Sequence, residues 1–93
     1  MTRDQVYALV DAERSRQLVK WGRPHPWGWG DCSSPHVTDL TKMAVLTEEV
    51  GEVARALLDG HDDGMRDELV QVAAVAVAWL ESLEAADGPS PQA

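Results

Sequence analysis

The sequence predicts an all-α protein that folds as a helical bundle of three main helices. Two observations carry this prediction. The 93 residues include no Phe, and the apolar side chains are mostly those of Ala, Val and Leu, a composition suited to closely packed helices. Apolar residues also recur at helical spacing in three segments that are separated by Gly and Pro. Because one domain of this length buries only a small core, we expect the bundle to be completed by dimerisation.

The first helix is expected over residues 3–20. Thr2 and Gln5 form a capping-box pattern at its start, in which each side chain bonds to the backbone N–H of the other residue. A glycine and a proline follow soon after residue 20 and end the helix. The segment 21–34 is rich in Gly, Pro and Trp, and we predict that it forms a loop.

The second helix is expected over residues 35–58. Ser34 is the predicted N-cap, and Pro35 suits the first helical position because its missing N–H would be unpaired there in any case. Gly60 lies just beyond the expected end of the helix, where a glycine commonly provides the C-terminal cap.

The third helix is expected over residues 65–84. Asp62 or Asp63 is its predicted cap, in a tight connection from the preceding helix. Residues 1–86 therefore form one domain, and residues 87–93 are predicted to be a disordered tail because they are rich in Gly, Pro and Ser.

The charge and cysteine content exclude several classes of protein. Sixteen acidic residues against eight basic ones give a formal net charge of −8, which disfavours binding to nucleic acid or to anionic membranes. The single cysteine, Cys32, excludes an intramolecular disulfide and favours a reducing compartment. The N-terminus is polar, and the longest apolar run, Val72–Leu80, is too short to span a bilayer. We therefore expect a cytoplasmic protein with no nucleic-acid and no membrane partner.

Three glutamates crowd the second predicted helix. Glu48, Glu49 and Glu52 lie within five positions of one another, where like charges three or four residues apart repel. Rotation by 100° per residue places them on one stripe together with Lys42. The opposite face is broadly apolar and is the expected core face: it carries Met43, Leu46, Val50, Val53, Ala54, Leu57 and Leu58. An acidic stripe is most often a solvated surface, and that interpretation stays open.

The third predicted helix carries a carboxylate in an apolar setting. Glu68 shares a line with Val72, Val75 and Trp79, where a carboxylate is destabilising unless a cation or donor compensates it. Two antiparallel helices joined by a short loop can bring the three glutamates opposite Glu68. Clustered carboxylate oxygens suit a hard divalent cation such as Mg²⁺, which would cancel the repulsion and attract a polyphosphate.

These residues occur in a recognisable order. The segment "LTEEVGEVARAL" followed by "DELVQVAAVAVAWLESL" resembles the MazG-like, all-α nucleoside triphosphate pyrophosphohydrolases, and "ERSRQLVKWG" resembles their N-terminal segment. That family carries a Glu-x-x-Glu pair, usually with a further Glu before it, and then a Glu-x-x-Asp pair. Glu49 and Glu52 match the first pair, Glu48 the additional acid, and Glu68 the start of the second pair.

The resemblance implies an activity and a metal. Members hydrolyse (deoxy)nucleoside triphosphates to the monophosphate and pyrophosphate with Mg²⁺, for which Mn²⁺ is a possible substitute, and they assemble as homodimers or higher homo-oligomers around a four-helix-bundle core. The implied catalytic residues are Glu48 and Glu49, with Glu48 either a ligand or the base that takes a proton from water. The implied metal ligands are Glu49, Glu52, Glu68 and Gln71.

Gln71 departs from the family pattern, which has Asp at this position. A neutral amide can offer a metal its carbonyl oxygen or donate a hydrogen bond, but it carries no charge and cannot act as a carboxylate base. A non-catalytic helical module of the same fold that binds a nucleotide or a metal is therefore the alternative function. A purely structural helical oligomer is a third interpretation.

The candidate substrate-binding residues are cations and one aromatic residue. They are Arg14, Arg16, Lys20 and Lys42 for the outer phosphates, and Trp21 for stacking on the base. Lys42 has the best claim among the cations because it lies on the acidic stripe. For each of these residues a plain surface or packing role is the competing interpretation.

Overall fold

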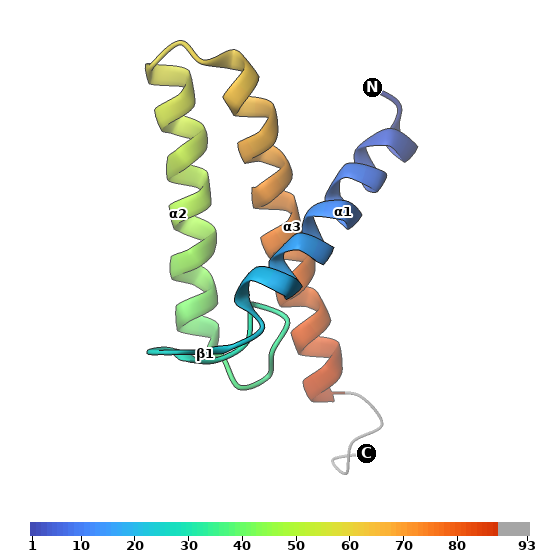
Figure 1. The fold of residues 1–93 in the computed structure, drawn as a ribbon, viewed down its shortest axis with the longest axis vertical. Coiled ribbons are helices and arrows are strands. Elements are labelled where there is room, and N and C mark those ends of the chain that lie inside the picture. Colours follow the sequence, from blue (N-terminus) through green and yellow to red (C-terminus); the bar gives the residue numbers. More distant parts are fainter. Residues whose placement is uncertain (88–93) are drawn as a thin grey trace.

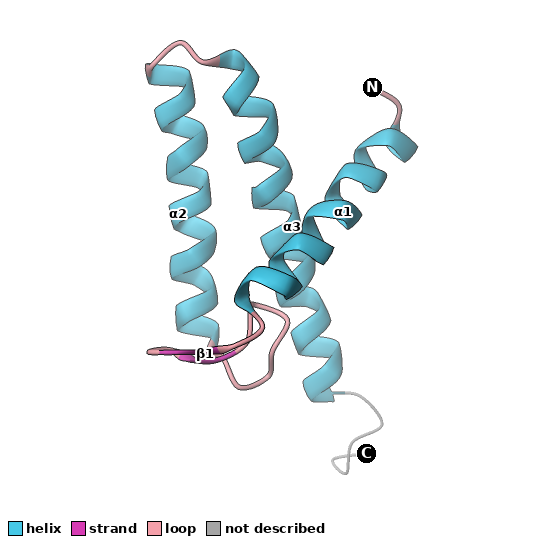
Figure 2. Cartoon of the chain, viewed as in Figure 1, coloured by secondary structure: helices cyan, strands magenta, loops and turns pink. Residues whose placement is uncertain are grey.

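A computed structural model describes residues 1–87 and places three helices and one short β-hairpin in this part of the chain (Figure 1). Their order is α1 (Arg3–Trp21), β1 (Pro24–His25), β2 (Gly28–Trp29), α2 (Asp39–Leu58) and α3 (Asp62–Asp87). Helices dominate the chain, so the all-α prediction is confirmed (Figure 2). Within residues 1–87, no helix combines the length and the apolar character that a membrane crossing requires.

The start of α1 forms as the sequence predicts. The Thr2 hydroxyl accepts a hydrogen bond from the Gln5 N–H at 3.1 Å, and the Gln5 side chain accepts one from the Thr2 N–H at 2.8 Å. The capping box is therefore confirmed. At the other end, the helix runs one residue beyond the predicted boundary, and the Gly22 N–H closes it by donating to the Leu18 carbonyl at 3.0 Å.

The start of α2 corrects the prediction. The helix begins at Asp39 instead of residue 35, because Thr38 is its N-cap and accepts from the Thr41 N–H at 3.2 Å. The predicted cap Ser34 instead lies in a preceding turn, where its hydroxyl accepts from the His36 N–H at 3.1 Å. Two residues of the Ser/Thr type compete for the cap, and the later one forms it.

The connection between α2 and α3 is tighter than expected. Gly60 has a φ of +72° and follows the end of α2, so its predicted capping role is confirmed. Its N–H donates to the Leu57 carbonyl at 3.2 Å, and the His61 N–H donates to the Ala56 carbonyl at 2.8 Å, the pair of bonds of a Schellman motif. The next helix begins immediately, at Asp62 instead of residue 65.

Helix α3 therefore extends beyond both ends of the predicted range 65–84. Asp62 and Asp63 are the first two residues of the helix itself and do not precede it as caps. The helix also continues through Asp87, the first residue of the predicted disordered tail. The remainder of that predicted tail, residues 88–93, lies outside the described residues.

The predicted loop 21–34 contains a two-stranded antiparallel hairpin. Pro24 pairs with Trp29 and His25 with Gly28, so that Pro26 and Trp27 form the turn. Gly28 adopts a φ of +132°, and a Cβ at this position would come within 2.9 Å of the His36 carbonyl oxygen. The segment before α2 thus packs directly on the hairpin backbone.

Helices α2 and α3 form an antiparallel pair, and α1 covers one side of this pair. In Figure 1, α2 and α3 lie side by side, α1 crosses α3, and the hairpin lies near the N-terminal end of α2. The buried apolar residues are few and mostly small: Cys32, Val37, Ala56, Ala74, Val75 and Ala78. The single chain therefore has a thin core for its length.

The expected core face of α2 is correct for Leu46 and Val53 and wrong for most of its other residues. Met43, Val50 and Leu57 are each about half exposed in the single chain, and Leu58 is largely exposed. The face that packs inward instead carries Lys42, Val45, Leu46, Glu49, Val53 and Ala56. The arc that faces α3 is thus offset by about a quarter turn from the most apolar arc, and this offset turns Glu49 toward the interior.

Candidate functional site

A pocket of about 440 Å³ lies between α1, the segment before α2, α2 and α3. Thr41, Val45 and Glu49 line it along α2, so it extends over about two turns, roughly 12 Å, of that helix. Glu48 of α2 and Gln71 of α3 line it as well. Three of the residues predicted from the glutamate motifs therefore share one cavity.

Glu49 is the least satisfied polar group at this pocket. Its Oε2 atom is buried and accepts no hydrogen bond from any residue in the part of the chain that the structure describes. Burial raises the pKa of Glu49, and the charges of Glu68, Glu48, Glu52 and Glu13 raise it further. The ionised carboxylate is therefore destabilised, and a cation would relieve it.

The other predicted site residues differ in place and in exposure: Glu48 and Gln71 line the pocket with Glu49, whereas Glu52 and Glu68 do not line it and act on Glu49 through their charge. Glu48 and Glu52 are exposed, whereas Glu68 and Gln71 are half-buried. Within residues 1–87, no three acidic, histidine or cysteine side chains are already placed to hold one metal ion. The donor chemistry fits a divalent cation, because hard oxygen ligands lie near an orphaned buried carboxylate. The side chains would have to turn toward a shared ion.

Glu13 of α1 is an acidic residue that the sequence analysis missed. It lines the pocket, its side chain is mostly buried, and its charge contributes to the raised pKa of Glu49. Glu13 accepts a hydrogen bond from the Arg16 Nε at 2.8 Å. Its spacing in the sequence could have identified it, because Glu13, Arg16 and Lys20 are three and four residues apart and therefore share one face of α1.

Two of the four predicted phosphate-binding cations line the pocket, namely Arg16 and Lys20. Lys42 does not, because its ammonium group lies in the α2–α3 interface and donates to the Ser82 hydroxyl at 2.7 Å. Its 2% exposure leaves no room for contact with a phosphate in this conformation. Lys42 lies on the side of the acidic stripe that faces inward with Glu49, whereas Glu48 and Glu52 of the same stripe are exposed.

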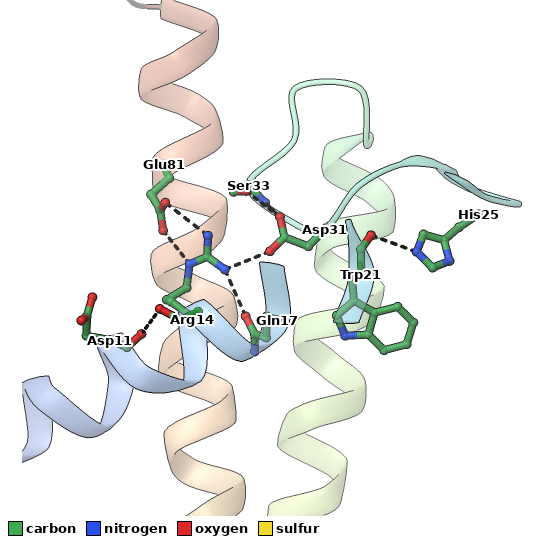
Figure 3. Close-up of polar contacts among 9 residues, drawn as sticks. Asp11, Arg14, Gln17, Trp21, His25, Asp31, Ser33 and Glu81 are labelled. Carbon is green, nitrogen blue, oxygen red and sulfur yellow. Dashed lines mark hydrogen bonds and ion pairs between the residues drawn. The ribbon is translucent and has the colours of Figure 1, made fainter. Parts of the chain in front are cut away.

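Arg14, another predicted phosphate-binding residue, is not among the lining residues of the pocket, because its side chain is bound to two carboxylates (Figure 3). Its guanidinium group donates to Asp31 Oδ2 at 2.9 Å and to both oxygens of Glu81, at 2.6 and 3.2 Å. Burial alone would lower the pKa of Arg14, but the hydrogen bonds and charges of Glu81 and Asp31 outweigh it and the pKa is raised. Arg14 therefore joins α1, the segment before α2, and α3.

Aromatic side chains form the hairpin end of the pocket. Trp21 and Trp27 line it, with their ring centroids 6.1 Å apart. His25 stacks on Trp27 at 4.4 Å with nearly parallel rings, and its Nε2 lies 3.1 Å from the Trp21 carbonyl oxygen. Trp21, the predicted base-stacking residue, is thus one of two tryptophans that line the pocket.

Cys32 also lines the pocket, but its thiol is not activated. It packs with Val75 and Ala78 in the apolar core, and burial together with the charge of Asp31 raises the pKa of the thiol. A thiol that is held protonated is a poor nucleophile. We therefore assign Cys32 to packing.

Comparison with known families gives one match. The model of the MazG nucleotide pyrophosphohydrolase domain matches residues 37–88, more than half of the chain. This range includes all of α2, all four glutamates of the motifs, and Gln71; it leaves out α1 and the hairpin. Comparisons with curated proteins and with solved structures gave no match.

Proposed function

This chain belongs to the MazG nucleotide pyrophosphohydrolase family, and on that basis we propose that it hydrolyses (deoxy)nucleoside triphosphates to the monophosphate and pyrophosphate. The observation that carries the proposal is the buried, unpaired carboxylate of Glu49, which lies at a pocket among four other acids. A folded protein retains such a destabilised group most readily where a ligand compensates it.

The proposed cofactor is Mg²⁺, with Mn²⁺ as a substitute. Glu49, Glu52 and Glu68 would hold it, with the Gln71 carbonyl oxygen as a weaker ligand. The ion would neutralise phosphate charge and lower the pKa of a bound water. The rise in the pKa of Glu49 caused by Glu68, Glu48 and Glu52 supports this ligand set, because the same charges that repel one another would attract a cation.

The chain's own residues supply the remaining roles. Glu48 is exposed at the pocket and is the proposed base that takes the proton of the attacking water. Arg16 and Lys20 are the proposed partners of the outer phosphates, where negative charge develops as pyrophosphate leaves. The ion pair between Arg16 and Glu13 is exposed on the arginine side and therefore weak, so phosphate can replace it.

A second candidate function is binding of a nucleotide without hydrolysis. Two observations favour it: Gln71 supplies no charge where the family has Asp, and no preformed group of three ligands occurs within residues 1–87. Pyrophosphate release from a panel of nucleoside triphosphates with Mg²⁺ distinguishes the two functions. Release supports the enzyme, whereas calorimetric binding without release supports the binding module.

We also propose that the functional unit is a homodimer. Large apolar side chains on α2 and α3 are between 42% and 82% exposed in the single chain: Leu40, Met43, Val50, Leu57, Leu69, Leu80 and Leu83. By helical rotation they lie on the side of the α2–α3 pair that α1 does not cover. A second copy packed there would create a four-helix bundle and the core that the single chain lacks.

Light scattering coupled to size exclusion tests the dimer. The wild type is expected at twice the mass of one chain, and Val50→Lys is expected to dissociate or unfold because it buries an unpaired charge. Asp63→Lys, an exposed position on the α1 side, serves as the control and should stay dimeric. A monomeric, folded wild type would contradict the proposal.

A further inference from the structure

The α1 wall of the pocket changes chemistry along its length, and the α2 wall is acidic only at the end that lies away from the hairpin. Along α1 the lining residues run from Glu13 through Arg16 and Lys20 to Trp21 at the hairpin end. Along α2 they run from Glu49 back to Thr41, which is also at the hairpin end. The pocket is therefore acidic at one end, cationic in the middle and aromatic beside the hairpin.

This order matches the groups of one nucleotide molecule together with its cation. A nucleoside triphosphate has a flat aromatic base at one end and anionic phosphates at the other, and a divalent cation binds to the phosphates. With the phosphates beside Arg16 and Lys20 and the cation at Glu49, the base can lie only toward the hairpin. That end is lined by Trp21, Trp27 and the buried side chain of Val37.

The hairpin holds one of these rings in place before any ligand binds. His25 stacks on Trp27 with an interplanar angle of 7°. The contact between His25 Nε2 and the Trp21 carbonyl oxygen connects the stack to the end of α1 (Figure 3). A ring that is already fixed at the wall of a pocket loses little side-chain entropy when a ligand stacks on it. The hairpin is thus built as a rigid aromatic surface.

We propose that the hairpin Pro24–Trp29 is the nucleobase-binding element of this protein. In this arrangement Trp27 contacts the base, and His25 is a positioning residue that acts through Trp27. The inference rests on the proposed function for the placement of the phosphates. It goes beyond that function by assigning recognition of the base to a segment outside the matched family domain.

Replacement of Trp27 tests the proposal. Trp27→Leu keeps apolar bulk but removes the ring, and we expect about a tenfold weaker affinity for nucleoside triphosphates. Ribose 5-triphosphate, which has no base, should bind the variant and the wild type equally. Trp29→Leu is the matched control, because Trp29 lies on the same hairpin, is more exposed and is not a lining residue of the pocket among those described.

Two variants of His25 test its positioning role. His25→Ala should weaken nucleotide binding in the same direction as Trp27→Leu, whereas His25→Phe should restore most of the affinity because it restores the stack. A merely structural role would not distinguish the nucleotide from the abasic triphosphate. Circular dichroism checks that each variant remains helical, and Trp27→Phe provides a folded variant that keeps a ring.

The outcomes separate this inference from the proposed function. Affinities are measured by calorimetry with a non-hydrolysable α,β-methylene nucleotide, so they do not depend on turnover. Absence of hydrolysis would count against the enzyme but leave the base-binding assignment open to the same comparison. Equal losses in Trp27→Leu and Trp29→Leu, or an equal loss for the abasic triphosphate, would overturn the assignment.

Discussion

Arg14 and Glu49 are both charged groups withdrawn from water, but their surroundings differ in kind. Arg14 is 5% exposed, and its guanidinium group is held by two carboxylates, those of Asp31 and Glu81. Asp31 is itself satisfied, since its second oxygen accepts from the N–H and the hydroxyl of Ser33. Glu49 has no such partners: one oxygen is orphaned, and its nearest charges are all negative.

This difference distinguishes Arg14, whose charge supports the fold, from Glu49, whose charge we propose binds a ligand. Arg14 connects three segments, and its neighbours Arg16 and Gln17 line the pocket, so the pair with Asp31 holds the α1 wall in position (Figure 3). The buried Oε2 atom of Glu49 has no hydrogen-bond partner among residues 1–87, and the ionised carboxylate lowers the stability of the fold. In this chain the compensated charge of Arg14 holds the pocket wall in place, and we propose that the uncompensated charge of Glu49 binds the ligand.

The largest expected effect is the loss of stability when Arg14, the compensated buried charge, is replaced. Arg14→Met removes the cation and leaves Asp31 buried without its partner, which should lower the free energy of unfolding by about 3–5 kcal/mol in urea denaturation. Glu81→Gln is the control: the Glu81 side chain is about half exposed, so its loss should cost roughly 1 kcal/mol or less. Similar losses in both variants would show that the pair with Asp31 is not the dominant one.

Replacement of Glu49, the uncompensated charge, should have the opposite effect on stability. Glu49→Gln removes a ligand and a repelled charge together, so we expect pyrophosphate release to fall at least about a hundredfold, or roughly 2.7 kcal/mol of activation free energy. The melting temperature without metal should rise. Activity assays and thermal melts on the same preparation test both expectations. An active Glu49→Gln variant would show that the site is assigned to the wrong residue.

Gln71→Asp sharpens the comparison by adding a charge beside Glu49. Gln71 lines the pocket, and a carboxylate there restores the family pattern. We expect Mg²⁺ to bind on the order of tenfold more tightly, with faster pyrophosphate release, while the metal-free protein becomes less stable. Calorimetric titration with Mg²⁺ measures the first change. An unchanged affinity would place Gln71 outside the metal site.

The accuracy of the sequence analysis depended on how local each feature is. The capping box of Thr2 with Gln5 and the turn at Gly60 were predicted correctly, because each depends on residues a few positions apart. The start of α2 was wrong because Ser34 and Thr38 are both good caps, and contacts from Asp31 and His36 decide between them.

The grouping of the acids was predictable from the sequence, but the residues packed around them were not. Glu49 and Glu68 were identified by spacing and resemblance, and the charge of Glu68 does act on Glu49. The inward direction of Lys42 and the contribution of Glu13 depend on how α1 and α3 pack, which no periodicity encodes. The hairpin was missed because two-residue strands carry no alternating pattern.

The smallest expected effect concerns pH. The folded-state pKa of Glu49 lies above its ordinary value of 4.5, so between these two values the folded protein binds a proton that the unfolded chain does not. The stabilisation from this proton is fully present below the unfolded pKa and is lost as pH rises through the folded pKa.

Wild type should therefore gain stability relative to Glu49→Gln as pH falls from neutral toward 4.5. Taking the difference between the two proteins removes the contributions of the other acids. Mg²⁺ at neutral pH should act like the proton, because either one compensates the same carboxylate, and the melting temperature of wild type should rise while that of Glu49→Gln rises less. If the two proteins show the same pH dependence and the same response to Mg²⁺, the charge of Glu49 is not the one that a cation would neutralise.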